Sequence, residues 1–142
     1  MHAKLEARQK RATLPLMMAR SCTTKKSGSG PVIIAPGRLF VFDSFHQLAD
    51  RYTVISYDMR NRGKSEHIDD GSKLTIQNDV RDLETVRQHF GVTRFTPVGY
   101  SYLGLMVVMY AMEHPDHVER IVQLGPVPLK FGTPISSGGD GE

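Results

Sequence analysis

Gly99-Tyr-Ser-Tyr-Leu-Gly104 joins a predicted strand over residues 94–98 to a predicted, almost wholly apolar helix that begins at Tyr102. A sharp turn from strand to helix lifts the side chain at its apex, here Ser101, clear of the sheet. The backbone N–H groups and the dipole at the start of the helix favour a developing negative charge beside that side chain. The stretch therefore predicts that Ser101 is a nucleophile and that the N–H of Tyr102 is one donor to an oxyanion.

Small residues flank such a turn because it brings backbone against backbone. Gly99 meets this requirement on one side, whereas Leu103 stands on the other and leaves Gly104 as the nearest small residue.

Two other interpretations stay open. The same letters form a degraded G-x-G-x-x-G nucleotide loop, but the acid expected about twenty residues on is matched only by Glu119, before the next predicted strand rather than after it. The second interpretation is an ordinary turn between strand and helix, with Ser101 as a surface serine without a function.

The chain from residue 32 onward alternates between strand and helix patterns with short links. Buried strands are predicted from short apolar or β-branched runs, and helices from apolar residues spaced three and four apart. Such alternation indicates an α/β fold of three layers, α/β/α, with a mostly parallel sheet. The predicted strands cover residues 32–35, 52–57, 94–98 and 120–124, and the predicted helices cover 42–50, 76–90 and 102–114.

A second motif, Asp58-Met-Arg-Asn-Arg-Gly63-Lys-Ser65, follows the second predicted strand. It nearly matches a phosphate-binding G-x-x-x-x-G-K-S loop, but Asp58 places a carboxylate where the phosphate would lie. We therefore reject a nucleotide site and predict a structural turn. Asn61 and Gly63 tolerate left-handed backbone, and the side chains of Asp58 and Arg60 are available to hydrogen-bond the turn.

A third loop, around Gly37 and Arg38, follows the first predicted strand. It can offer a backbone N–H toward Ser101 across neighbouring strand ends. Parallel sheets bind ligands at the carboxyl ends of their strands, and all three motifs fall at that edge. The shared edge predicts one site for a small-molecule or peptide substrate.

These three motifs, in this order and spacing, resemble the α/β-hydrolase superfamily over about residues 30–133. They are Pro36-Gly37, Asp58-x-Arg60-x-x-Gly63-x-Ser65 and Gly99-Tyr-Ser101-Tyr. The turn at Gly99–Gly104 corresponds to the family's nucleophile elbow, and the helix after it to the elbow helix. The stretch from Glu113 to Leu124 is similar to the segment after the elbow helix in the proline iminopeptidase-like and epoxide-hydrolase-like branches. The resemblance implies an incomplete α/β-hydrolase fold. Three residues depart from the family's usual ones: Pro36 replaces His, Asn61 replaces Gly and Leu103 replaces Gly.

By this resemblance the protein is a serine hydrolase that cleaves an ester, an amide or an amino-terminal peptide bond. Ser101 corresponds to the nucleophile, and the backbone N–H groups of Tyr102 and Arg38 correspond to the oxyanion hole. No metal and no cofactor is implied. The residues that support the elbow and the turns are Gly99, Gly104, Gly37, Asp58, Arg60 and Gly63.

Family members place the acid and then the histidine of the triad beyond the elbow helix, and we expect this chain to end before both. His114 and His117 lie roughly 18 Å or more from the start of that helix, at about 1.5 Å per residue, too far to take a proton from Ser101. We therefore expect a truncated hydrolase that is inactive by itself. The alternative is a non-catalytic truncated homologue that binds a partner, or a second copy, through an exposed sheet edge from Arg120 to Leu124.

The length of 142 residues predicts one domain, and its single cysteine, Cys22, leaves the cytoplasm as the expected location. Residues 1–30 hold seven Lys or Arg and one acid, whereas the rest hold eleven and fourteen. We expect a poorly ordered basic segment over 1–30, a core over 31–133 and a flexible Gly/Ser-rich tail over 134–142. The basic segment weakly imitates a targeting peptide but lacks the aromatics of a nucleic-acid binder, and no stretch is long enough to span a membrane.

Overall fold

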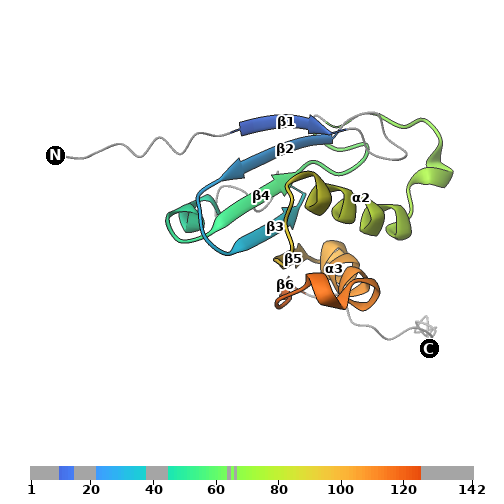
Figure 1. Cartoon of the computed structure of the whole chain (residues 1–142). Coiled ribbons are helices and arrows are strands. Elements are labelled where there is room, and N and C mark those ends of the chain that lie inside the picture. Colours follow the sequence, from blue (N-terminus) through green and yellow to red (C-terminus); the bar gives the residue numbers. More distant parts are fainter. Residues whose placement is uncertain (1–9, 15–21, 38–44, 64, 66, 126–142) are drawn as a thin grey trace, which may run out of the picture.

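The computed structural model describes residues 10–14, 22–37, 45–63, 65 and 67–125, in which three strands come first and strands then alternate with helices (Figure 1). The strands are β1 (Lys10–Leu14), β2 (Cys22–Ser27), β3 (Val32–Pro36), β4 (Thr53–Tyr57), β5 (Thr96–Tyr100) and β6 (Val122–Leu124). The helices are α2 (Ile76–His89) and α3 (Tyr102–Glu113), with short 3₁₀ helices η1 (His46–Asp50), η2 (Gly71–Lys73) and η3 (Pro115–His117). The alternation predicted from residue 32 onward is confirmed. Residues 42–44 of the first predicted helix and the predicted tail, 134–142, lie outside the described residues.

The strands form a six-stranded sheet in the order β1-β2-β4-β3-β5-β6. β3 pairs in parallel with β4 and with β5, and β5 pairs in parallel with β6. β1 and β2 extend the sheet in antiparallel fashion beyond β4. The parallel pairing brings the carboxyl ends of β3, β4 and β5 to one edge, as predicted from the three motifs.

Helix α2 has a polar signal at its start, a glycine after its end and an apolar face between them. The Thr75 hydroxyl caps the start by accepting a hydrogen bond from the Asn78 N–H at 3.3 Å. Gly91 follows the last turn with a φ of 62°, a backbone conformation that ends helices. Apolar residues spaced three and four apart lie on one face, and those that are buried are Val80, Leu83 and Val86.

The nearly all-apolar composition of the helix after the turn predicts burial, and the structure shows α3 buried on one side only. Met106, Val107 and Tyr110 are inaccessible to solvent, whereas the Met112 side chain on the other side is 77% exposed. In the part of the chain that the structure describes, neither α3 nor any other helix has the length and apolar character needed to cross a membrane.

The two faces of the sheet carry different layers. Helices α2 and α3 cover one face (Figure 1). The segment around η1 covers the other, where Phe45 and Leu48 pack against the sheet. The three predicted layers are therefore present. The first face presents Ile34, Ile55 and Tyr57, and the second presents Ile33, Ala35 and Val98.

The expectation that residues 1–30 are poorly ordered is wrong for β1 and β2. Strand β2 pairs with β4 from Thr24 opposite Tyr57 to Ser27 opposite Val54, and both Thr24 and Ser27 are buried. The edge of β4 away from β3 offers backbone N–H and C=O groups that need partners. Pairing with that edge stabilises a segment rich in Thr and Lys, whose own apolar content is too low to predict a strand.

The turn between β2 and β3 is closely packed, whereas its Gly-Ser-Gly sequence predicts a flexible joint. Gly28 has a φ of 79° and Gly30 a φ of 109°. A Cβ atom on Gly28 would lie 2.2 Å from the Tyr52 carbonyl oxygen and 2.4 Å from that of Ala49. Only glycine fits such a position. The predicted domain boundary at residue 30 is therefore a turn within the sheet.

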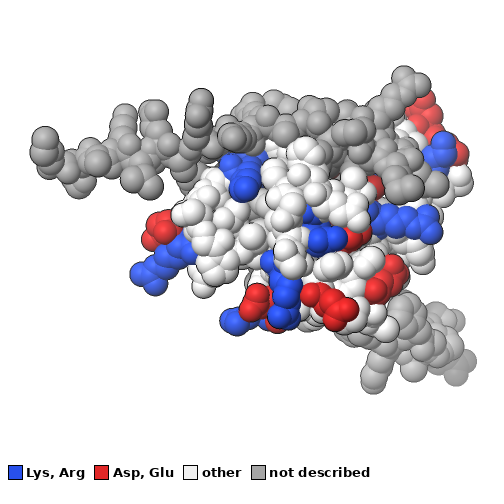
Figure 2. Space-filling view, viewed as in Figure 1, with Lys and Arg blue, Asp and Glu red and all other residues white. Residues whose placement is uncertain are grey.

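Charged side chains of both signs are interspersed on the face shown in Figure 2. Lys26, from the basic N-terminal segment, lies against the core, with its ammonium 5.7 Å from the centre of the Phe90 ring. Such a contact is a cation–π attraction. Part of the basic charge near the N-terminus is thus held beside the end of α2.

Glu84 joins α2 to α3. Its carboxylate accepts hydrogen bonds from Arg87 at 2.6 and 2.9 Å, from Gln88 at 2.9 Å and from the Tyr110 hydroxyl at 2.6 Å. Burial by itself raises the pKa of Glu84, but the hydrogen bonds from Arg87, Tyr110 and Gln88 and the charge of Arg87 outweigh it and lower the pKa to about 2. The carboxylate is therefore ionised down to strongly acidic pH.

We predict that Glu84→Gln makes the fold less sensitive to acid. Folding lowers the pKa of Glu84 from 4.5 to about 2. The ionised carboxylate therefore stabilises the folded state above its unfolded pKa, and this contribution is lost as the pH falls through the folded value. Urea unfolding between about pH 5 and pH 2 should show a smaller fall in the free energy of unfolding for the variant, by on the order of 1 kcal/mol because solvent screens the pair.

The matched control for this pH series is Glu113→Gln, which alters an exposed acid on α3 and should keep the parent's pH dependence. Equal pH dependence in the parent and in Glu84→Gln would contradict the role assigned to Glu84.

Candidate active site

Ser101 lies at the apex of the turn between β5 and α3, with φ of 53° and ψ of −120°. This backbone conformation is sparsely populated and costs about 1–3 kcal/mol for a residue other than glycine. Two hydrogen bonds hold it: the Ser101 N–H donates to the Leu124 carbonyl at 3.0 Å, and the Gly104 N–H donates to the Ser101 carbonyl at 2.8 Å. The surrounding elements therefore impose the conformation at the residue predicted from the sequence.

Gly99 permits the sharp turn. A Cβ atom there would lie 2.2 Å from the Leu103 carbonyl oxygen and 2.7 Å from the Gly104 nitrogen, so the close approach is backbone against backbone. The Leu103 side chain points to another neighbour, since a Cβ on Gly37 would lie 2.8 Å from its Cδ1 atom. The turn thus accommodates Leu103, and the small residues at its contact are Gly99 and Gly104.

The predicted structural turn after β4 is confirmed. Asn61 and Gly63 both adopt left-handed backbone, with φ of 54° and 58°. A Cβ on Gly63 would lie 2.5 Å from the Asp58 carboxylate, so the turn folds back over that side chain. The Asn61 amide donates to the Ile68 carbonyl at 2.8 Å, and the Ser65 hydroxyl donates to the Asp58 carbonyl at 2.6 Å. Asparagine therefore fits where the family usually has glycine.

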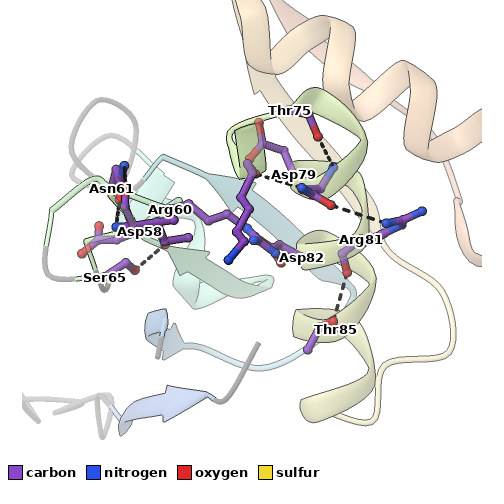
Figure 3. A network of polar contacts seen from close by, with 12 residues as sticks. Asp58, Arg60, Asn61, Ser65, Thr75, Asp79, Arg81, Asp82 and Thr85 are labelled. Atoms are coloured by element: carbon purple, nitrogen blue, oxygen red, sulfur yellow. Dashed lines mark hydrogen bonds and ion pairs between the residues drawn. The ribbon is translucent and has the colours of Figure 1, made fainter. Parts of the chain in front are cut away.

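Arg60 fastens this turn to α2. Its Nε and Nη2 atoms donate to the two carboxylate oxygens of Asp82, and both side chains are almost fully buried (Figure 3). Burial raises the pKa of Asp82, while the hydrogen bonds and the charge of Arg60 oppose that rise. Removing two charges from water is costly, so the pair depends on its bidentate geometry. The support predicted for Arg60 is thus an ion pair with a helix that sequence alone did not connect to it.

A pocket of about 490 Å³ opens beside Ser101, within the usual range for small-ligand sites. Its polar wall includes a pair that the sequence analysis missed, in which the Tyr102 hydroxyl donates to the Asp79 carboxylate at 2.9 Å. The residues that line it are Gly37, Met59, Arg60, Asn61, Arg62, Leu74, Asp79, Tyr100, Ser101, Tyr102 and Leu103.

Both members of the Asp79–Tyr102 pair have perturbed pKa values. Burial raises the pKa of Asp79, as does the charge of Asp82, although the hydrogen bond from Tyr102 works in the opposite direction. Burial, followed by the bond to Asp79, raises the pKa of Tyr102 to about 12. Tyr102 therefore keeps its proton at neutral pH and acts as the hydrogen-bond donor. An acid in the first turn of a helix is the only sequence signal for Asp79, and that signal ordinarily indicates helix stabilisation.

The structure brings Gly37 and Ser101 to one pocket, and no histidine is among the described residues that line it. The Gly37 N–H donates to the Tyr57 carbonyl at 3.0 Å, which holds this loop on β4. Arg38 lies outside the described residues, so the second predicted oxyanion donor stays a prediction. Tyr102 is the first residue of α3, where N–H groups have no partner within the helix.

We predict that Gly99→Ala damages the elbow and that Gly104→Ala does not. The added methyl at residue 99 collides with backbone and should cost about 1–3 kcal/mol or more in the free energy of unfolding. At Gly104 the nearest atom is the Gln123 side-chain nitrogen at 3.4 Å, and alanine favours helix, so we expect a change within about 1 kcal/mol. Urea unfolding of both variants measures the difference, and equal losses would contradict the backbone contact.

Comparison with known proteins identifies the family. The family described as "alpha/beta hydrolase fold" matches residues 30–137. A probable 1-acylglycerol-3-phosphate O-acyltransferase from Oryza sativa is 31% identical over 101 residues, covering 69% of this chain and 24% of the relative. A putative proline iminopeptidase from Mycoplasma pneumoniae is 36% identical over 72 residues, covering 51% and 23%. The chain thus spans about a quarter of the length of these relatives.

Solved structures agree on the fold. The proline iminopeptidase-related protein from Thermus thermophilus superimposes with a TM-score of 0.77 at 18% identity, covering 84% of this chain and 45% of that protein. An epoxide hydrolase from Vigna radiata gives a TM-score of 0.75 at 20% identity, covering 89% and 42%. With a family match over most of its length, this chain belongs to the α/β-hydrolase fold family.

Proposed function

We propose that this chain carries the nucleophile and the oxyanion hole of a serine hydrolase acting on an ester, an amide or an amino-terminal peptide bond. The observation that supports the proposal most directly is the backbone of Ser101, with φ of 53° and ψ of −120° beside a pocket. Residues with such strained backbone conformations cluster at functional sites. A surface serine in an ordinary turn has no need of that conformation.

In the proposed reaction, the Ser101 hydroxyl attacks the carbonyl carbon of the substrate and forms an acyl-enzyme with loss of the alcohol or amine. The N–H groups of Tyr102 and Arg38 donate to the oxyanion, and the start of α3 adds its dipole. A serine hydroxyl needs a base to attack at a useful rate. The histidine base and its acid would have to come from outside the described residues.

The pocket favours a substrate with an apolar group near the reacting carbon. Met59, Leu74 and Leu103 supply apolar surface, and the Asp79–Tyr102 pair supplies polar groups on the same wall. The relatives include a protein named as an acyltransferase and others named as proline iminopeptidases. We propose an acyl group as the part of the substrate that this chain binds.

We predict that the thiol introduced by Ser101→Cys has a pKa well below the usual value of about 8.5, because it lies at the N-terminus of α3. The rate of iodoacetamide labelling against pH, read peptide by peptide, separates this thiol from Cys22. Ser72→Cys, at an exposed position in η2, is the matched control, and its thiol should titrate at or above the usual value because the Asp70 carboxylate lies beside it. An equal pKa in both variants would argue against the elbow environment.

Acyl transfer to Ser101 is tested with an activated ester, p-nitrophenyl acetate, by intact-mass measurement. Without a base the reaction should be slow. In triad enzymes that have lost a triad residue, the oxyanion hole and substrate binding alone still accelerate the reaction roughly 10³–10⁴-fold over water. An acetyl group on Ser101 that is absent in Ser101→Ala and retained in Ser72→Ala supports the nucleophile. Acetylation unaffected by Ser101→Ala contradicts it.

The second candidate is an interaction module that pairs through β6. Strand β6 ends the sheet order, and among the described strands it pairs only with β5. Ile121 and Leu124 are 38% and 39% exposed beside this edge. An open edge with apolar side chains is a template for strand addition.

If β6 joins two copies, Ile121→Lys should shift the mass measured by light scattering from dimer toward monomer, because lysine discourages edge pairing. Met112→Lys is the control: it alters a more exposed apolar side chain on α3 and should leave the mass unchanged. A parent that is monomeric at every concentration rules out self-association through β6.

A further inference from the structure

Three metal-ligating side chains converge at the end of α3 that lies away from Ser101. They are Glu84 on α2, His114 just after α3 and His117 in η3, and one ligand atom of each lies within 4.8 Å of the others. All three side chains are half-buried. The cluster therefore joins two helices at a place where the proposed hydrolase chemistry needs no histidine.

The ring of His117 is already oriented as in many metal sites. Its Nδ1 atom lies 3.2 Å from the Thr93 carbonyl oxygen. A carbonyl only accepts hydrogen bonds, so in the neutral imidazole this contact assigns the proton to Nδ1 and leaves the lone pair on Nε2. Metal-bound histidines ordinarily donate their other ring N–H to a carbonyl or carboxylate in this way.

The second imidazole lies close by. The rings of His114 and His117 are 6.0 Å apart and inclined by only 28°. His114 also lies against the Tyr110 ring, with 4.8 Å between centroids. Two imidazoles and one carboxylate form a donor set that suits zinc and neighbouring transition metals, whereas magnesium and calcium prefer oxygen donors.

An ion at this cluster must compete for Glu84, whose oxygens accept bonds from Arg87, Gln88 and Tyr110. Each carboxylate oxygen offers two lone pairs, and each already accepts two hydrogen bonds. Among these donors, Tyr110 is the one whose ring contacts His114. We infer that its hydroxyl is the donor that an ion would replace.

We propose that Glu84, His114 and His117 bind a divalent transition metal ion of the zinc type, which replaces the Tyr110 hydroxyl as a partner of Glu84. Zinc lies about 2.0–2.2 Å from nitrogen and oxygen ligands, so the three ligand atoms must close by roughly 1 Å from their present limit. Side-chain rotation supplies such a movement. The bound ion clamps α2 to the end of α3 and to η3, and water completes its coordination.

The test uses the full chain and Zn²⁺ alone, measured by isothermal titration calorimetry and by thermal unfolding. The parent used as the reference and every variant carry His2→Ala, because a terminal amine next to a histidine chelates metals by itself. His114→Ala and His117→Ala should each weaken Zn²⁺ binding at least about tenfold and abolish the rise in unfolding temperature that Zn²⁺ produces. His89→Ala removes an exposed histidine at the end of α2 and should change neither.

Tyr110→Phe tests the exchange of partners independently of the histidines. It removes the hydroxyl that competes for Glu84 while keeping the buried ring, so Zn²⁺ binding should become tighter. Binding that is unchanged or weaker in this variant overturns the exchange. The site is overturned if the parent binds no Zn²⁺. It is also overturned if His114→Ala, His117→Ala and His89→Ala all bind Zn²⁺ with the same affinity.

Discussion

The backbone of Ser101 is the constraint on which the arrangement of this molecule depends. A serine with a positive φ persists only when the surrounding structure holds its backbone in that conformation. Here the N–H bonds to Leu124 in β6, the carbonyl accepts from Gly104 in α3, and Gly99 allows the two backbones to approach. Strand order, helix position and one glycine must therefore all be correct before the apex residue can be held.

The buried Arg60–Asp82 pair fixes the position of the neighbouring loop, the turn after β4. The two charges cost solvation free energy, and an apolar pair of similar size could stabilise a core as well. What an apolar pair lacks is direction. Two parallel hydrogen bonds fix the turn after β4 on α2, and that turn contributes Met59 and Asn61 to the pocket wall. The ion pair thus serves the shape of the site.

Local patterns explain how much of the fold can be read from the sequence. Apolar periodicity predicts α2, and the strand–glycine–serine–helix order predicts the elbow, because both depend on neighbouring residues. Strand β2 is not predicted, since its stability comes from pairing with β4, about thirty residues away. A hydrophilic strand that is stabilised by pairing with a distant strand has the sequence pattern of a poorly ordered tail.

The candidate site divides in the same way. Ser101, Gly99 and the Asp58 turn follow from local backbone requirements and are visible as motifs. Asp79 is not, because its partner Tyr102 lies on another helix and 23 residues away. Asp82 is hidden for the same reason, paired with Arg60 across 22 residues. Contacts between elements arise from tertiary packing, which single-sequence patterns do not encode.

The hydrogen bond from Ser101 to Leu124 connects the two functions proposed for this chain. It fixes the apex residue through β6, which stands at the end of the sheet order among the described strands. A strand that pairs with β6 would restrain Leu124 and, through it, the backbone on which the nucleophile is held. Under these two proposals edge pairing and catalysis are not exclusive alternatives: a strand added to β6 would also stiffen the turn at Ser101, so the reactivity of Ser101 should depend on whether that edge is occupied.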